Sequence, residues 1–172
     1  MLRTLFLLVA ALTGMAAVRA DDVKVAKPAE EAYTDASFVA NAASCNMLEV
    51  QLGQLAATKA KSEAVKKYAE MMVEDHRKAS EQIAKLAEKA TLTVPTKLNA
   101  EHQKCFDTLK DNENFDKEYI TGSIKSHEMG VKAFKRAIAE SKDAGIKEFA
   151  LKYLPILESH LEQAKKLQDG AK

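Results

Sequence analysis

Three histidines and one glutamate interrupt apolar helical patterns along this chain. His76, His127 and His160 each stand where the spacing of three and four residues calls for an apolar side chain, and Glu49 flanks a fourth such stripe. Imidazole binds zinc, copper, iron and nickel, and a carboxylate tolerates several of these ions. Helical bundles build metal sites from side chains on facing helices. The four residues therefore predict a site for one transition-metal ion, Zn, Cu or Fe.

The same residues also fit a metal-free arrangement. A single histidine on an apolar stripe is commonly a hydrogen-bonded core residue, and the carboxylate could accept hydrogen bonds from all three imidazoles. The first interpretation suggests metal handling or protection against envelope stress. The second suggests a structural or interaction protein of the cell envelope, whose protein partner the sequence does not identify, with a polar layer that fixes helix register.

Enzymatic chemistry finds less support in the sequence. There is no glycine-rich phosphate loop, no His-Glu-x-x-His motif, and no serine or cysteine in a recognisable nucleophile motif. An enzyme built on the metal site would need an open coordination position and a cleft, which the sequence does not indicate. We therefore expect binding rather than turnover.

Four long helices are expected to position these residues. The chain is rich in alanine, leucine, lysine and glutamate and has no tryptophan, which is typical of an all-α protein. The apolar periodicity and the capping residues, with Asp35 and Ser62 as N-caps and residues 143–145 as a C-cap and turn, predict helices over 35–60, 62–90, 115–142 and 146–167. A crossover of about twenty residues joins the second and third, with a short extra helix over 98–110. The predicted fold is an all-α, ferritin-like four-helix bundle.

The predicted helices place the four polar residues near one level. At ~1.5 Å per residue, His127 and His160 both lie roughly 24 Å from the turn that joins their helices. Measured from the first turn, Glu49 and His76 differ in height by only ~4 Å. All four lie near the middle of their helices, so we expect them to share one layer of the core. His102, on the crossover helix, is expected at the surface.

The N-terminal segment indicates export. Arg3 precedes an apolar run from Leu5 to Val18, and the small residues Val18 and Ala20 fit a signal-peptidase site. We predict a signal peptide over 1–20, a flexible linker over 21–34 and the bundle over 35–169. The protein would then act in the periplasm or cell envelope, with no membrane span left after cleavage.

Charge excludes some partners. The chain has 26 basic and 25 acidic residues, and loss of the signal peptide with its two arginines leaves 24 basic residues. Because both signs are interspersed along the helices, no basic stripe for nucleic acid is expected.

Three further residues leave alternatives open. In an oxidising compartment Cys45 and Cys105 could form a disulfide, or they could be two buried thiols. Asp75, next to His76, could be a solvated charge or could orient a histidine of an adjacent helix.

Several segments of the chain resemble a known family. It is similar to secreted bacterial ferritin-like proteins of unknown function that are often labelled predicted outer membrane proteins. The resemblance spans about residues 36–167 and is carried by Phe38-Val39, Glu49-Val50, Leu52 to Ala56, Met72-Val73, Asp75-His76, Phe115-Asp116, Tyr119 to His127, Leu154-Pro155 and His160-Leu161. It implies a ferritin-like fold and export, but no reaction.

The ferritin-like di-iron proteins use paired Glu-x-x-His motifs. Here the residues three positions before the histidines are Val73, Ile124 and Leu157, none of which is a glutamate. Iron storage or oxidase chemistry of that kind is therefore disfavoured, and a mononuclear histidine-rich site remains.

Overall fold

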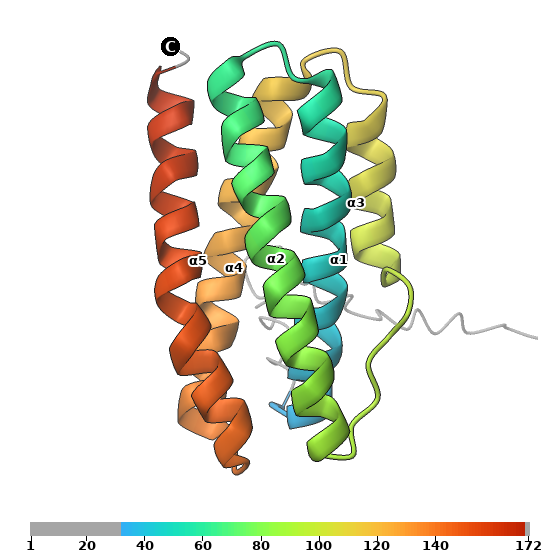
Figure 1. The fold of residues 1–172 in the computed structure, drawn as a ribbon, viewed down its shortest axis with the longest axis vertical. Helices are drawn as coiled ribbons and strands as arrows, with labels where there is room; N and C mark the ends of the chain where they lie inside the picture. The colour runs from blue at the N-terminus through green and yellow to red at the C-terminus, as the bar shows by residue number, and fades with distance from the viewer. Residues whose placement is uncertain (1–31, 171–172) are drawn as a thin grey trace, which may run out of the picture. The chain divides into compact units, whose positions relative to one another are not determined.

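The computed structural model describes residues 32–170, and every regular element in this range is an α-helix (Figure 1). The predicted signal peptide and most of the predicted linker lie outside the described residues. The helices are α1 (Asp35–Lys59), α2 (Glu63–Lys89), α3 (Ala100–Lys110), α4 (Phe115–Glu140) and α5 (Ala144–Gly170).

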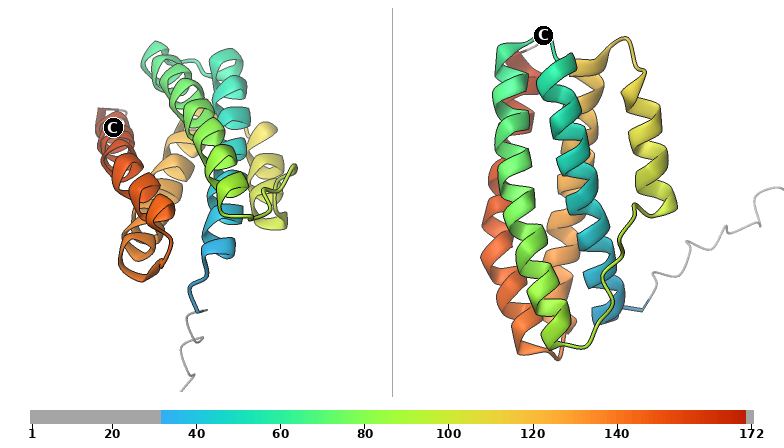
Figure 2. Two further views of the ribbon diagram at one scale, coloured as in Figure 1. Left: turned by 60° about the horizontal axis from the view of Figure 1, so that its bottom comes forward. Right: turned by 45° about the vertical axis from the view of Figure 1, so that its right-hand side comes forward.

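The helices pack as two antiparallel hairpins that form a four-helix bundle (Figures 1 and 2). One hairpin is α1 with α2, and the other is α4 with α5. Between the hairpins, α2 lies beside α5 and α1 lies beside α4. The short helix α3 lies in the crossover and packs on α1 and α4. The predicted all-α four-helix bundle with an extra crossover helix is thus confirmed.

Capping residues set the helix boundaries, and two of them differ from the prediction. Thr34, not Asp35, caps α1, because its hydroxyl accepts a hydrogen bond from the Ser37 amide. Ser62 caps α2 as predicted. The carboxylate of Asp143 accepts from the Ile146 amide at 2.9 Å, so residues 143–145 begin α5 instead of ending α4.

The other end points differ by a few residues. α4 ends at Glu140, two residues before its predicted end, because Ser141 adopts an extended conformation at the C-cap. α5 continues to Gly170, three residues beyond its predicted end.

The core consists of two apolar clusters, one toward each end of the bundle. Along α2, Met72 belongs to one cluster and Ala79 to the other, with His76 between them. Along α5, Ala164 and Leu157 flank His160 in the same way. The histidine positions therefore form a polar layer between two apolar halves, and packing on both sides fixes its height.

A close contact between α1 and α2 sets the register of the first hairpin. A Cβ atom added to Gly53 would lie 2.6 Å from Cγ2 of Val73 and 2.9 Å from the backbone oxygen of Ala69. Because a backbone atom cannot move aside, we expect Gly53→Ala to lower the free energy of unfolding by about 1–3 kcal/mol in urea titrations. Gly122→Ala is the matched control, since no atom of the described residues lies within 4 Å of its added Cβ. That variant should gain about 0.5–1 kcal/mol from helix propensity; equal stabilities of the two variants would contradict the close contact.

Candidate metal centre

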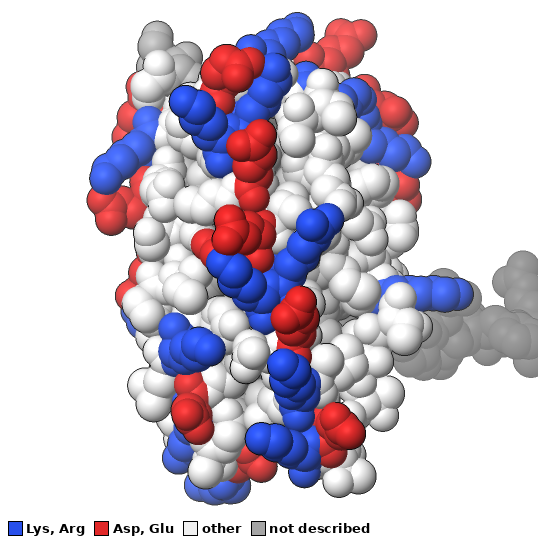
Figure 3. Space-filling model, viewed as in Figure 1, with Lys and Arg blue, Asp and Glu red and all other residues white. Residues whose placement is uncertain are grey.

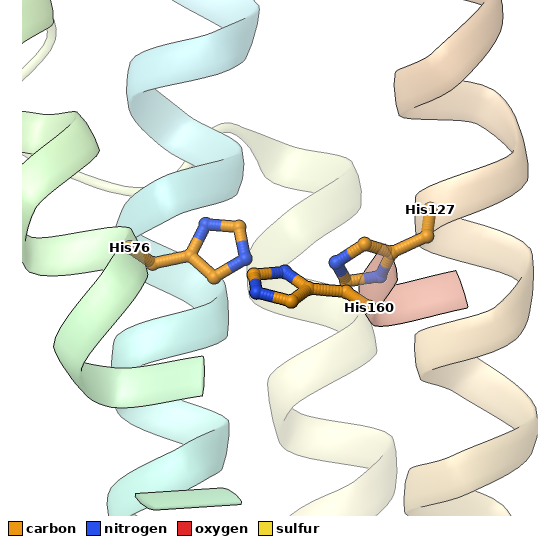
Figure 4. A group of neighbouring side chains, drawn as sticks. All are labelled: His76, His127 and His160. Atoms are coloured by element: carbon orange, nitrogen blue, oxygen red, sulfur yellow. The ribbon is translucent and has the colours of Figure 1, made fainter. Parts of the chain in front are cut away.

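The imidazoles of His76, His127 and His160 meet in the middle of the bundle (Figure 4). They come from α2, α4 and α5, and their exposed fractions are 3%, 2% and 2%. The ring centroids are separated by 5.7, 5.5 and 5.3 Å, which makes the cluster nearly equilateral. One nitrogen from each ring lies within 4.8 Å of the other two. The structure therefore brings together three of the four residues that the sequence singled out.

Hydrogen bonds fix the orientation of the first two rings. Nδ1 of His76 donates to Oδ1 of Asn46 on α1 at 2.8 Å. Nδ1 of His127 donates to the backbone oxygen of Ser123, one turn earlier on α4, also at 2.8 Å. Because each acceptor is an oxygen, the hydrogen of each neutral ring resides on Nδ1, and Nε2 carries the lone pair.

The third ring has the opposite tautomer. Nε2 of His160 donates to Oδ2 of Asp75 at 3.0 Å, so its hydrogen resides on Nε2 and its lone pair on Nδ1. Of the two interpretations of Asp75, the structure shows the contact with a histidine of an adjacent helix. Such carboxylate–histidine pairs commonly orient metal-binding imidazoles.

The nitrogens that carry the lone pairs have no hydrogen-bond partner among the described residues. These three atoms are all buried; they are Nε2 of His76, Nε2 of His127 and Nδ1 of His160. Leaving a buried polar atom unpaired costs about 1–3 kcal/mol. Three lone pairs facing one space suit a cation, whereas a water molecule can donate only two hydrogen bonds.

The spacing of the nitrogens is compatible with one ion. Three atoms within 4.8 Å of one another have a common centre no more than about 2.8 Å from each. Imidazole binds zinc at roughly 2.0–2.1 Å, and inward shifts of less than about 1 Å per ring would reach that distance.

Burial favours the neutral form of His76 and of His160. It lowers the pKa of His76 well below the usual value, and charge repulsion from His127 and His160 lowers it further. Burial also lowers the pKa of His160, although the hydrogen bond to Asp75 acts in the opposite direction. Neutral imidazole is the form that binds metals.

Glu49 lies outside the three-histidine cluster. Its side chain is buried at 2% exposure, and Oε1 accepts a hydrogen bond from the Ser126 hydroxyl at 2.7 Å. Glu49 therefore joins α1 to α4 in a separate polar contact. Of the four predicted ligands, it is the one that the structure does not place with the others.

Asn46 is the α1 residue that reaches the histidine layer, and the prediction missed it. Counted from Lys61 in the first turn, Asn46 and His76 are equally far along the chain, whereas Glu49 is three residues nearer the turn. This equal distance from the turn is the feature of the sequence that could have identified Asn46 as the neighbour of His76. The sequence favours Glu49 over Asn46 only by ligand type, because a carboxylate binds several transition-metal ions.

His102 is not a surface residue as predicted, but is half-buried between α3 and α1. Its Nδ1 lies 2.7 Å from the hydroxyl of Ser44, which also accepts from the Asn99 amide at 2.9 Å. Burial lowers the pKa of His102. Its role is to hold the crossover helix on the bundle, away from the three-histidine cluster.

The two cysteines are free thiols. Cys45 is half-buried and Cys105 is exposed, so the structure contains neither the disulfide nor the pair of buried thiols. Burial raises the pKa of Cys45 to about 12, which makes its thiol unreactive at neutral pH.

The surface over α2 carries both charge signs. Figure 3 shows Lys and Arg side chains interleaved with Asp and Glu on this face, and Lys78 with Glu74 is one such pair at 2.6 Å. No helix within residues 32–170 has both the length and the apolar character needed to cross a membrane.

Solved structures share this fold at low sequence identity. CopM in its Cu(I)-bound form is 17% identical with a TM-score of 0.69, over 81% of this chain and 98% of that chain. CopM in its Cu(II)-bound form is 18% identical with a TM-score of 0.71, over 83% and 100% of the two chains. A DUF305 fragment from Deinococcus radiodurans is 10% identical with a TM-score of 0.68, over 78% and 94%. These similarities establish the helical-bundle fold.

No curated protein matches the sequence. The family is nevertheless clear, because residues 20–167 match one family model over most of the chain. That family has no assigned activity, in agreement with the resemblance found in the sequence. The chain belongs to the family described as a domain of unknown function, DUF4142.

Proposed function

We propose that this protein binds one copper ion, as Cu(I), through Nε2 of His76, Nε2 of His127 and Nδ1 of His160. Its role is metal handling in the periplasm or cell envelope. The observation that carries this proposal is the convergence of three buried imidazole nitrogens, each with a free lone pair and no partner among residues 32–170.

Charge favours Cu(I) over a divalent ion. The three ligands are neutral, and the Born cost of burying an ion grows with the square of its charge. The Born cost of burying a monovalent ion in this layer is therefore about a quarter of the cost for a divalent ion. Imidazole is a suitable copper ligand, and zinc usually takes four ligands in tetrahedral geometry. CopM, which has the same fold, has been obtained in Cu(I)-, Cu(II)- and Ag-bound forms.

The burial of the candidate site favours metal handling over catalysis. The three free nitrogens are buried, so a substrate could not approach an ion held between them. Catalytic metal sites keep an open position for water or substrate.

Two observations support export. The family match begins at residue 20, where we predict the signal peptide to end. The described helices also include no candidate membrane span.

The metal-free polar layer is the competing interpretation. In that interpretation the carboxylate of Glu49 accepts hydrogen bonds from the three imidazoles. Instead, Glu49 accepts from the Ser126 hydroxyl. The three N–H groups donate to other oxygen atoms, and three lone pairs remain unpaired among the described residues.

A thermal titration tests the proposal. The protein is prepared without a tag and with the substitutions Cys45→Ala and Cys105→Ser. These substitutions remove the two thiols, which would also bind soft ions. Ag⁺, a redox-inert analogue of Cu(I), should raise Tm with a break at one equivalent. At a free concentration of 1,000 Kd the gain is about 4 kcal/mol, or roughly 8–16 °C at this chain length. Zn²⁺ should raise Tm by much less. If neither ion changes Tm, the layer is a metal-free core.

A further inference from the structure

A surface pocket of about 370 Å³ lies between α2 and α5, beside the three-histidine cluster. Its walls include Gln82 on α2 and Lys152, Tyr153 and Ile156 on α5. The carboxylate of Asp75 also lines the pocket. The pocket therefore reaches a residue that already holds one of the histidines.

A single imidazole ring separates this pocket from the centre of the cluster. Oδ2 of Asp75, on the pocket wall, accepts from Nε2 of His160 at 3.0 Å. The opposite nitrogen of the same ring, Nδ1, is one of the three unpaired nitrogens. The side chain of Asp75 is 31% exposed, whereas that of His160 is 3% exposed. His160 thus lies between the partly exposed Asp75 and the site.

The other two histidines are held from inside the protein. Asn46, the partner of His76, is 7% exposed, and Ser123, the partner of His127, is 4% exposed. Of the three outer partners, only Asp75 contacts solvent to a substantial degree. His160 is therefore the ligand whose support can open without disrupting the core.

The backbone beside the pocket is weakened by a proline. Pro155 lies inside α5, next to the pocket residue Ile156 and five residues before His160. Proline has no amide hydrogen, so the carbonyl of Leu151 lacks its helical hydrogen bond there. Such positions are where helices bend. This part of α5 can shift more easily than a continuous helix.

We propose that this pocket is the route by which Cu(I) enters and leaves the cluster, with His160 as the moving ligand and Asp75 as the residue that returns it to position. The inference rests on the proposed function and adds the path and the labile ligand. The charged side chains that line the pocket are two acidic ones, Asp75 and Glu81, and two basic ones, Lys78 and Lys152. Because these charges offset one another, the rate of uptake should depend little on ionic strength.

Obstruction of the pocket tests the route. The double variant Gln82→Trp, Lys152→Trp places one large side chain on each wall and leaves every ligand and outer partner intact. The matched control, Gln54→Trp with Lys67→Trp, changes two exposed helical residues that do not line the pocket. Both are made in the cysteine-free protein, loaded with one equivalent of Cu(I), and mixed with excess bicinchoninate to follow release by absorbance.

We expect the pocket variant to release Cu(I) at least about fivefold more slowly than the control, with equilibrium affinities that agree within about twofold. The affinity is retained because a blocked route slows uptake and release equally. Release at the control rate would overturn the route and leave the proposed function standing. If the parent protein holds no Cu(I), both proposals fail.

A second pair of variants tests the moving ligand. Asp75→Leu removes the acceptor that holds His160 and should speed release by about 10–100-fold. Asp75→Asn keeps an oxygen acceptor of the same size and should restore slow release. Equal release rates for these two variants would overturn the role of Asp75 as a positioning residue.

Discussion

Replacement of His127 by leucine is expected to abolish tight Cu(I) binding without unfolding the protein. The loss should exceed the roughly 10–100-fold that removal of an outer partner costs, because a ligand itself is lost. Competition with a chromophoric Cu(I) chelator measures the affinity. The Ag⁺-induced rise in Tm should disappear in the same variant.

The stability of the metal-free His127→Leu protein separates a binding role from a structural one. Leucine fills the site with apolar atoms and removes Nε2, a buried nitrogen that has no partner in the described part of the chain. The Ser123 carbonyl keeps the backbone hydrogen bond of the helix. We therefore expect the variant to be at least as stable as the parent in urea. A large loss of stability together with unchanged Cu(I) affinity would assign His127 to a structural layer.

His102 provides the matched control for this experiment. It is the only other histidine of the four in the chain, and it contacts Ser44 on α1 instead of the cluster. His102→Gln should retain one equivalent of Cu(I) with unchanged affinity. Any effect on stability would reflect the docking of α3.

The second large effect is a loss of stability in mild acid. For the metal-free protein we expect the free energy of unfolding to fall by about 2–4 kcal/mol between pH 7 and pH 5. Urea titrations at intervals of half a pH unit would measure the decrease. This range lies above the pKa values of ordinary carboxyl groups, so histidines dominate it.

The loss of stability in acid follows from the numbers of protons that the folded and unfolded states bind. In the unfolded chain, His76 and His160 take up protons below about pH 6.5. In the folded protein, burial lowers the pKa of both, so each takes up its proton at a lower pH than in the unfolded chain. The unfolded state therefore binds more protons, and stability is complete above pH 6.5 and lost below it. Each histidine that remains neutral contributes a slope of about 1.4 kcal/mol per pH unit.

Removal of one of these histidines tests the assignment. His76→Leu should reduce the slope by about 1.4 kcal/mol per pH unit, because one fewer proton separates the two states. A slope that does not change would show that His76 is already protonated in the folded protein. Saturating Cu(I) should displace the whole curve upward at pH 7 and release the metal as the pH falls.

The sequence alone determined the fold and the location of the polar layer. Apolar residues at helical spacing define four helices, and the short and long connections between them dictate the pairing. His76, His127 and His160 were identifiable because each stands alone in an apolar stripe near mid-helix. Apolar periodicity and the position of a histidine within a helix are local properties of the chain, so they can be inferred before any tertiary contact is known.

Only the tertiary structure decided which groups support the site. α1 packs against α2, α3 and α4, so it is buried around much of its circumference, and both Asn46 and Glu49 are buried. Its apolar pattern therefore does not specify which of them faces the histidines, and the rotation of α1 in the packed bundle places Asn46 there. The hydrogen bond that His160 donates to Asp75 likewise depends on the separation of α2 and α5, which no local pattern encodes. Helix positions follow from periodicity, whereas hydrogen-bond partners follow from rotations that only packing fixes.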